Sequence, residues 1–475
     1  MRNGVVYSAE LQSFDNADED DLEDSQKSAL EMDLEEEEEV FESQATLTKL
    51  HSKHTKYDDG RTSFSMSVFN LSNAIMGSGI LGLSYALSNT GLVLFPLMLL
   101  SVTLLSLYSI NLLLRCSKKE DCMVYEDLGF KAFGMPGKLA VFGSTFLQNI
   151  GAILSYMFIV KNEFPLVIKY MSGLDDGHEA WYVDGNNLIV IVTIAVILPL
   201  CLLKTLGYLG YTSGFSLGCM VFFLFVVIFK KFTLPCPGIE LNVTLVTHNE
   251  TCEESYISFN SKTIYALPTI LFAYVCHPSV LPIYSELKDR SIKKMEAVSK
   301  VSFFSMFVMY LLTAVFGYLT FYSYVNDQLL HTYSRHDDIL ILIVRLAVFT
   351  AVILTVPVLF FVVRSSALEL MKQKQFKWSL HIGVTFILLA LCVLLVIFIP
   401  SIKDIFAVIG ATSANMLIFI LPAAIYLKLN DSLPFKKRIM PILFLTAGVI
   451  SALITVPLVI IDWVHTVQNN ETTAH

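Results

Sequence analysis

The first sixty residues lack any run of apolar side chains that could form the hydrophobic region of a cleavable signal peptide. We therefore expect the first membrane span to direct insertion and the N-terminus to lie in the cytosol. Basic residues are also scarce here, because the segment holds eighteen acidic and five basic side chains, including the run Glu35 to Glu39. This composition cannot bury enough apolar surface to offset the entropy lost on ordering. We predict that residues 1–60 form a disordered acidic cytosolic tail.

This tail allows two interpretations. Its charge is typical of a solvated segment, and the alternative is a handle for regulation. In the second case the partner would be a kinase or a ubiquitin ligase. The candidate ubiquitin acceptors are Lys27, Lys49, Lys53 and Lys56.

Charged residues are few in the whole chain, at 16%, while hydrophobic residues make up 54% and the mean hydropathy is +0.61. Apolar blocks of about twenty residues recur to the end of the chain, as in proteins that cross a membrane many times. The polar stretches between the blocks are too short to hold a soluble catalytic domain. The sequence therefore predicts an all-α polytopic membrane protein that is not an enzyme and binds no nucleic acid.

We expect eleven transmembrane helices, which exclude a seven-helix receptor and leave a transporter, a channel or a membrane-resident receptor. Their approximate positions are 64–90, 92–114, 139–168, 187–203, 207–229, 263–284, 301–323, 338–363, 380–399, 403–427 and 439–462.

The distribution of lysine and arginine predicts the orientation of these spans. The loops after spans two, six, eight and ten are rich in both residues, which places them in the cytosol. The loop 231–262 then lies outside, although Lys230 and Lys231 at its start run against the bias. The final segment, residues 429–475, contains the eleventh span. Because the number of spans is odd, its C-terminus lies outside the cell.

The outer loop carries further signs of an extracellular location. Asn242 and Asn249 each begin an N-glycosylation sequon. Cys236 and Cys252 lie in the same loop, where disulfides persist, and we predict a disulfide between them. The loop therefore reads as a glycosylated extracellular segment, and we expect the protein in the plasma membrane.

The first span contains an unusual stretch, FNLSNAIMGSGILGLSYALSNTG, with Gly77, Gly79 and Gly82 among several polar side chains. The three glycines match G-x-G-x-x-G, but no strand precedes them and they lie in a membrane span, so we reject a nucleotide site. Two explanations remain, which are close packing of helices through small residues and an interruption of the helix.

A matching irregularity in span six favours the interruption. Pro278 and Pro282 lie in mid-membrane, and a proline removes an amide donor and disfavours helix in the residue before it. We expect the chain to unwind near Cys276 to Pro278. Broken helices five spans apart indicate two inverted five-helix repeats, residues 61–230 and 263–428, with a substrate near the midplane.

The groups exposed by the first break suit an anionic group and a cation. The amides of Gly77, Ser78 and Gly79 begin the second half-helix, where a partial positive charge favours a carboxylate. The carbonyls near Asn73 and Met76 end the first half-helix and suit a sodium ion.

Other spans supply complementary candidates. Ala273 and Tyr274 lie at the second break, and Asn149 in span three could line the substrate pocket, with helix packing as its alternative. Thr350 and Thr355 lie in an otherwise apolar span eight. Such threonines usually bond back to their own helix, but the proline two residues after Thr355 weakens the local ladder, and we expect Thr355 to bind sodium.

Several long motifs in order resemble those of the sodium-coupled neutral amino acid transporters, within the amino acid and auxin permease group. The motifs are SVFNLSNAIMGSGILGLSYALSNTG, LGYLGYTSGFSLGCMVFF, FAYVCHPSVLPIYSELKDRS, LTVPVLFF and IDWVH. The similarity runs from about residue 60 to residue 465. The segments CMVYE, AWYVDG, ILPLCLLK and GATSANMLIFILP look closest to the system A branch, in particular its first member.

This resemblance implies a leucine-transporter-type fold, a 5+5 inverted repeat with helices 1 and 6 broken. It also implies electrogenic symport of sodium with small neutral amino acids such as glutamine, alanine and serine, with no organic cofactor. By motif position, Asn73 in LSNAI and Thr355 in LTVPV are the sodium residues. The alternatives are system N exchange, in which protons leave as sodium enters, and an amino-acid sensor with little net transport.

Three ionisable residues remain. His277 in span six is a functional candidate because it is ionisable within the membrane, and its alternative is a neutral ring bonded to a nearby carbonyl. Arg345 in span eight faces a water-filled vestibule or pairs with an acid that the sequence does not identify. His475 would be extracellular, and since an unperturbed histidine has a pKa of about 6.5, we hypothesise that it lowers transport in acid.

Overall fold

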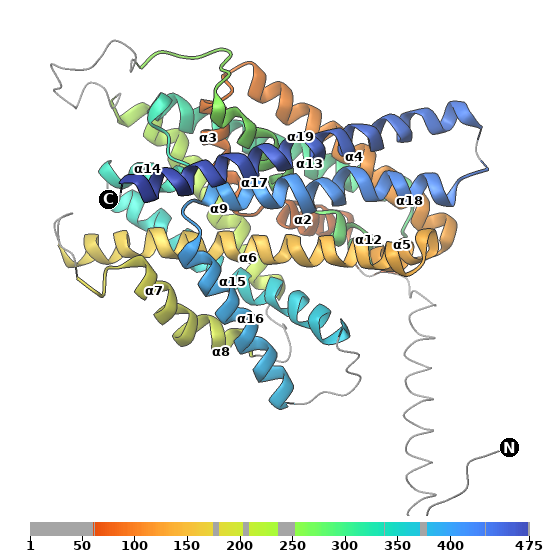
Figure 1. The fold of residues 1–475 in the computed structure, drawn as a ribbon, viewed down its shortest axis with the longest axis horizontal. Coiled ribbons are helices and arrows are strands. Elements are labelled where there is room, and N and C mark those ends of the chain that lie inside the picture. The colour runs from red at the N-terminus through yellow and green to blue at the C-terminus, as the bar shows by residue number, and fades with distance from the viewer. Residues whose placement is uncertain are drawn as a thin grey trace, which may run out of the picture. The chain divides into compact units, whose positions relative to one another are not determined.

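Helices dominate the part of the chain that the computed structural model describes, residues 60, 62–173, 180–202, 209–235, 252–336, 338–370, 378–432 and 434–473 (Figure 1). Within these ranges the only β-pairing is one isolated parallel bridge between Thr62 and Leu287. The chain divides after Gly60 into two units. Residues 1–59 of the predicted tail lie outside the described residues. The all-α fold class is confirmed.

The helices and the short 3-10 or π-helical turns, which are labelled η, follow one another along the chain. They are α2 (Phe64–Ile75), η1 (Ser78–Gly82), α3 (Leu83–Ser88), α4 (Leu94–Glu120), α5 (Tyr125–Phe133), α6 (Met135–Ser172), α7 (Gly185–Val192), η2 (Thr193–Ile197), α8 (Leu198–Cys201), α9 (Leu209–Thr233), η3 (Ser261–Tyr265), α11 (Ala266–Tyr274), α12 (His277–Glu286), α13 (Ile292–Phe321), η4 (Tyr322–Tyr324), α14 (Leu329–Thr332), η5 (Tyr333–His336), α15 (Ile339–Leu370), α16 (Trp378–Phe398), α17 (Ile402–Ile409), η6 (Gly410–Ala414), η7 (Met416–Ile420), α18 (Leu421–Leu429) and α19 (Phe435–Thr473).

Nine helical segments of the described chain are long and apolar enough to cross a membrane, and the bent pair of α2 with η1 and α3 raises the number to ten. The predicted fourth span corresponds to Gly185–Cys201, which is apolar but shorter than the other nine. A π-helical turn interrupts it from Thr193 to Ile197. The predicted total of eleven spans is not confirmed, because this segment is short for a helix that crosses about 30 Å of hydrocarbon.

The first predicted break is confirmed. Helix α2 ends at Ile75, and Met76 and Gly77 both take extended backbone conformations. The chain then resumes as the tighter 3-10 turn η1 before α3, and the two halves meet at a bend of 52°. The break leaves the last carbonyls of α2 and the first amides of η1 without a following or preceding helical turn.

The second break is also confirmed, with a small correction to its position. Val275 is extended and Cys276 departs from helical geometry, but α12 already begins at His277. The prediction placed the unwinding as far as Pro278. Proline is tolerated in the first turn of a helix because its missing N–H would have no intrahelical partner there, so Pro278 starts α12 and does not interrupt it.

The bridge between Thr62 and Leu287 joins the chain just before α2 to the chain just after α12. The Thr62 amide donates to the Glu286 carbonyl at 2.9 Å, and the Lys288 amide donates to the Thr62 carbonyl at 2.9 Å. The two broken spans are therefore tied to each other at one end.

The partner of Arg345 is Glu163 on α6. The guanidinium Nε lies 3.0 Å from the carboxylate Oε2, and both side chains are 1% exposed. The Gln328 amide, which precedes α14, donates to the other carboxylate oxygen at 2.6 Å. One buried carboxylate thus connects α6, α15 and the segment that enters α14.

The two lysines that run against the charge bias have partners that account for them. Lys230 on α9 forms an ion pair with Asp338, which precedes α15. Partial burial acts to raise the pKa of Asp338, but the hydrogen bond and charge of Lys230, together with the backbone amides of Leu340 and Ile341, outweigh it and hold that pKa below its ordinary value. Lys231 donates to the carbonyl of Leu319 on α13. Both ammonium groups are thus satisfied by the protein and need not lie in the cytosol.

Candidate functional site

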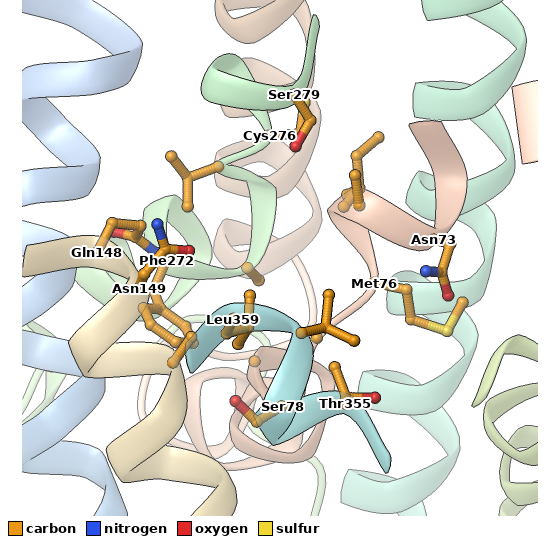
Figure 2. Close-up of a pocket in the computed structure, with 18 of the residues that line it drawn as sticks. Asn73, Met76, Ser78, Gln148, Asn149, Phe272, Cys276, Ser279, Thr355 and Leu359 are labelled. Atoms are coloured by element: carbon orange, nitrogen blue, oxygen red, sulfur yellow. The ribbon is translucent and has the colours of Figure 1, made fainter. Parts of the chain in front are cut away.

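A cavity of about 250 Å³ lies where the two broken helices meet α6 and α15. Figure 2 shows Asn73 and Met76 on one side of it and Gln148 and Asn149 on the other. The lining comes from seven elements or their ends, and its members are Asn70, Asn73, Ala74, Ile75, Met76, Gly77, Ser78, Gly79, Gln148, Asn149, Ala152, Tyr156, Ser216, Phe272, Ala273, Val275, Cys276, Pro278, Ser279, Thr355, Val358 and Leu359. All three residues predicted to bind sodium line this cavity.

Thr355 keeps the hydrogen bond typical of an intramembrane threonine and still presents an oxygen to the cavity. Its hydroxyl donates to the carbonyl of Ala351, one turn earlier, at 2.7 Å. This bond uses the proton and leaves the lone pairs of the oxygen, which are the groups that a hard cation requires. The other candidate, Thr350, also donates to its own helix, at 2.7 Å to Leu346, but its side chain is exposed and does not line the cavity.

The end of α2 forms the other side of the predicted sodium site, across from Thr355. Met76 is extended, and its amide closes the helix on Ser72 at 2.9 Å. The carbonyls of the last turn, which includes Asn73, lack the amides of a continuing helix because the chain turns away at Gly77. Backbone oxygens and the Thr355 hydroxyl can together supply the oxygen ligands that a sodium ion needs.

The glycines of the break serve both explanations that the sequence left open. A Cβ on Gly79 would lie 2.8 Å from the Cα and Cβ of Ala273, so this glycine allows η1 and α11 to touch. A Cβ on Gly82 would lie 2.8 Å from the Phe406 ring. Gly77 has more room, with the Tyr156 hydroxyl 3.4 Å away. Close packing therefore explains Gly79 and Gly82, while Gly77 lies at the break itself.

Helix α6 contributes more polar side chains to the cavity wall than the sequence predicted. Asn149 donates its amide nitrogen to the Thr145 carbonyl at 3.0 Å, which leaves its amide oxygen for the cavity. Gln148, which we did not predict, accepts a hydrogen bond from Ser413 on η6 at 2.9 Å. An amide beside Asn149 in an apolar span was the signal that could have indicated it. The hydroxyls of Ser78 on η1 and Ser155 on α6 share a hydrogen bond of 2.5 Å.

Tyr274 does not line the cavity, although Ala273 before it does. The Thr103 hydroxyl on α4 donates to the Tyr274 hydroxyl at 2.9 Å, and the ring stacks on Phe303 with a centroid distance of 5.7 Å. The reason is that a buried tyrosine hydroxyl needs a polar partner, and α4 provides one away from the cavity. Phe272 and Cys276, near the second break, also line the cavity and were not among the predicted site residues.

His277 is fully buried and is not part of the cavity lining. Neither ring nitrogen has a hydrogen-bond partner among the described residues, so the predicted bond to a nearby carbonyl is absent there. Four other predicted site residues lie outside the described residues: Cys236, Asn242, Asn249 and His475. Cys252 is in the disulfide-bonded state, while the pairing with Cys236 stays a prediction.

Comparison with known proteins gives one family and two solved structures of one transporter with a related fold. Residues 60–461 match the family described as transmembrane amino acid transporter protein. A protein named sodium-coupled neutral amino acid symporter 2, from Danio rerio, is 52% identical over 451 residues, which cover 90% of this chain and 89% of that protein.

The solved structures show a similar fold. One is Mhp1, a nucleobase-cation-symport-1 family transporter, in a closed conformation with bromovinylhydantoin bound; its TM-score is 0.53 at 10% identity, over 87% of this chain and 95% of that one. The inward-facing conformation of Mhp1 gives the same score and identity over 86% and 92%. At this identity the likeness concerns the fold alone.

Proposed function

Because the chain belongs to the transmembrane amino acid transporter family, we propose that it is a secondary active symporter that moves small neutral amino acids into the cell with sodium. The observation that carries this proposal is the cavity in which both broken helices end, with freed backbone groups beside the Thr355 hydroxyl. Family membership also confirms the resemblance seen in the sequence and the prediction that the chain is not an enzyme.

The two ligands would share the broken first span. The amides at the start of η1 favour the substrate carboxylate, and the oxygens at the end of α2 with Thr355 favour sodium. Binding of the ion at the end of α2 would fix the break and so prepare the carboxylate site. The inward sodium gradient and the membrane potential both drive uptake, since each charge that crosses is worth about 2.3 kcal/mol per 100 mV.

The packing supports a conformation that is closed toward the outside. In the predicted orientation, Asn70 and Ser279 lie on the cytosolic side of the two breaks, and both line the cavity. On the outer side, Ile80, Leu81 and Leu83 have no exposed surface, and α14 packs against η1 and α3. Transport would require the first, second, sixth and seventh spans to rock against the remaining helices. These spans consist of α2 with η1 and α3, α4, α11 with α12, and α13.

The test is sodium-dependent alanine uptake with simultaneous current recording for the wild type, Asn73→Ala and Thr355→Ala. We expect inward current that needs both sodium and alanine. The apparent sodium affinity should fall by about tenfold or more in each variant, because Thr355→Ala removes the hydroxyl oxygen and Asn73→Ala removes the amide oxygen of another side chain that lines the cavity. Thr350→Ala is the matched control, since Thr350 makes the same bond to its own helix outside the cavity, and its affinity should not change.

Each outcome of this experiment selects one function. Current with uptake supports electrogenic, system A type symport at the plasma membrane. Uptake without current would replace it with system N exchange, in which protons leave as sodium enters. Binding of alanine without uptake would replace it with an amino-acid sensor.

Acid inhibition is a separate part of the proposal. If His475 is extracellular, its protonation as the external pH falls through about 6.5 should reduce transport. The His475→Ala variant is expected to keep more of its uptake at pH 6 than the wild type, relative to uptake at pH 7.5. An unchanged pH profile in uptake measurements would remove this residue from the proposal.

A further inference from the structure

Tyr310 lies in the middle of α13, and its hydroxyl contacts a carbonyl oxygen from each broken span. The hydroxyl lies 3.0 Å from the carbonyl oxygen of Ile75 and 2.9 Å from that of Ala273. The side chain has no exposed surface and does not line the cavity. It therefore acts from behind the cavity wall, on two residues that do line it.

These two carbonyls belong to the points where the helices stop. Ile75 is the last residue of α2, and Ala273 is the last but one of α11. A hydroxyl has one proton and two lone pairs, so Tyr310 shares a single proton between the two carbonyl oxygens.

Removing this hydroxyl would leave two buried carbonyl oxygens close together with one donor fewer. Buried backbone groups without a partner are rare and destabilising, and two such oxygens also repel each other. The breaks would relieve this by moving apart. Tyr310 thus keeps the end of α2 and the end of α11 at a fixed separation.

We propose that Tyr310 is a positioning residue that couples the two breaks, so that the ion site at the end of α2 and the substrate site between η1 and α11 form together. This inference rests on the proposed symport function and adds the coupling group to it. In this arrangement sodium that orders the end of α2 also sets the position of Ala273, through a hydroxyl that touches neither ligand.

The Tyr310→Phe variant isolates the hydroxyl. The ring packs edge-on against Tyr274 with a centroid distance of 5.3 Å, and phenylalanine retains that contact. Tyr318→Phe is the matched control on the same helix, because the Tyr318 hydroxyl accepts from the Ser255 backbone amide at 2.9 Å, away from the breaks.

The measurement is the apparent sodium affinity of alanine-induced current, taken at low and at saturating alanine. In the wild type, saturating alanine should raise the sodium affinity. In Tyr310→Phe we expect the sodium affinity at saturating alanine to fall by about tenfold, close to its value at low alanine, so that the ratio between the two conditions falls toward one. Tyr318→Phe should keep the wild-type affinities and ratio.

A structural role alone would give a different result. It would lower the amount of transporter at the cell surface while the two affinities and their ratio stayed at wild-type values, and that outcome overturns the proposal. If little of the variant reaches the surface, the same ratio is obtained from sodium-dependent thermal stabilisation of the purified, monodisperse fraction with and without alanine. A wild type without sodium-dependent current or uptake would instead contradict the proposed function.

Discussion

Replacing Glu163 with glutamine is expected to lower the free energy of unfolding by about 3–5 kcal/mol, because it leaves the charge of Arg345 buried without its carboxylate. Both side chains are 1% exposed, and Arg345 Nε lies 3.0 Å from Glu163 Oε2. Glutamine preserves the size of the side chain, so the loss reports on charge and not on a cavity. We expect a large decrease in the melting temperature of the purified protein and little transporter at the cell surface.

Two further variants show whether burial is the cause. Glu120→Gln removes the carboxylate of an exposed pair with Lys131, whose side chains are 26% and 40% exposed, and should cost less than about 1 kcal/mol. The double variant Glu163→Gln with Arg345→Met removes both buried charges and should recover much of the stability. A Glu163→Gln melting temperature equal to that of Glu120→Gln would contradict the assignment.

Gly79→Ala is expected to reduce sodium-dependent alanine uptake by at least tenfold or so, since overpacking commonly costs about 1–3 kcal/mol. The new Cβ would lie 2.8 Å from the Cα and Cβ of Ala273. Backbone atoms cannot rotate out of the way as a flexible side chain can, so η1 and α11 would have to separate. That separation would displace the amides that face the cavity.

The control is Gly143→Ala on α6, because a Cβ at that position meets no atom within 4 Å. It makes the same chemical change in another long helix of the bundle and should leave uptake within about twofold of the wild type, as surface substitutions usually do. Uptake in Gly79→Ala at the wild-type level, with normal substrate affinity, would show that η1 and α11 need not touch.

The breaks in the first and sixth spans could be predicted from the sequence because proline and glycine act locally. A proline affects its own residue and the one before it, so the irregular stretch was found within two residues. The remaining error, at Pro278, arose because the same residue can end one helix or begin the next. The sequence alone does not decide which of these two roles a proline has, because it does not give the position of the last helical turn.

Contacts between distant segments could not be predicted in the same way. Glu163 and Arg345 are separated by almost two hundred residues, and no periodicity pairs one acid with one base over such a distance. Tyr274 was placed in the cavity by its neighbourhood in sequence, but a partner on α4 draws its hydroxyl elsewhere. The hydrogen bond between Gln148 and Ser413 on η6 likewise joins segments that are far apart in the sequence.

Thr355 shows what pattern reasoning can and cannot decide. The sequence left open whether its hydroxyl bonds its own helix or faces a ligand, and treated these as alternatives. The structure has both, because the proton goes to Ala351 and the oxygen borders the cavity. The hydroxyl of Thr350 makes an identical bond from an exposed position, so orientation around the helix, and not residue type, distinguishes the two.

The backbone bridge between Thr62 and Leu287 limits how the ends of α2 and α12 can separate. The chain entering α2 and the chain leaving α12 are joined there by two hydrogen bonds of 2.9 Å, and Tyr310 joins the inner ends of α2 and α11. Helix α2 is thus joined to the sixth span at both of its ends, to the chain after α12 before its first residue and to α11 at the break. Any movement of α2 away from the sixth span would first have to break one of these sets of hydrogen bonds.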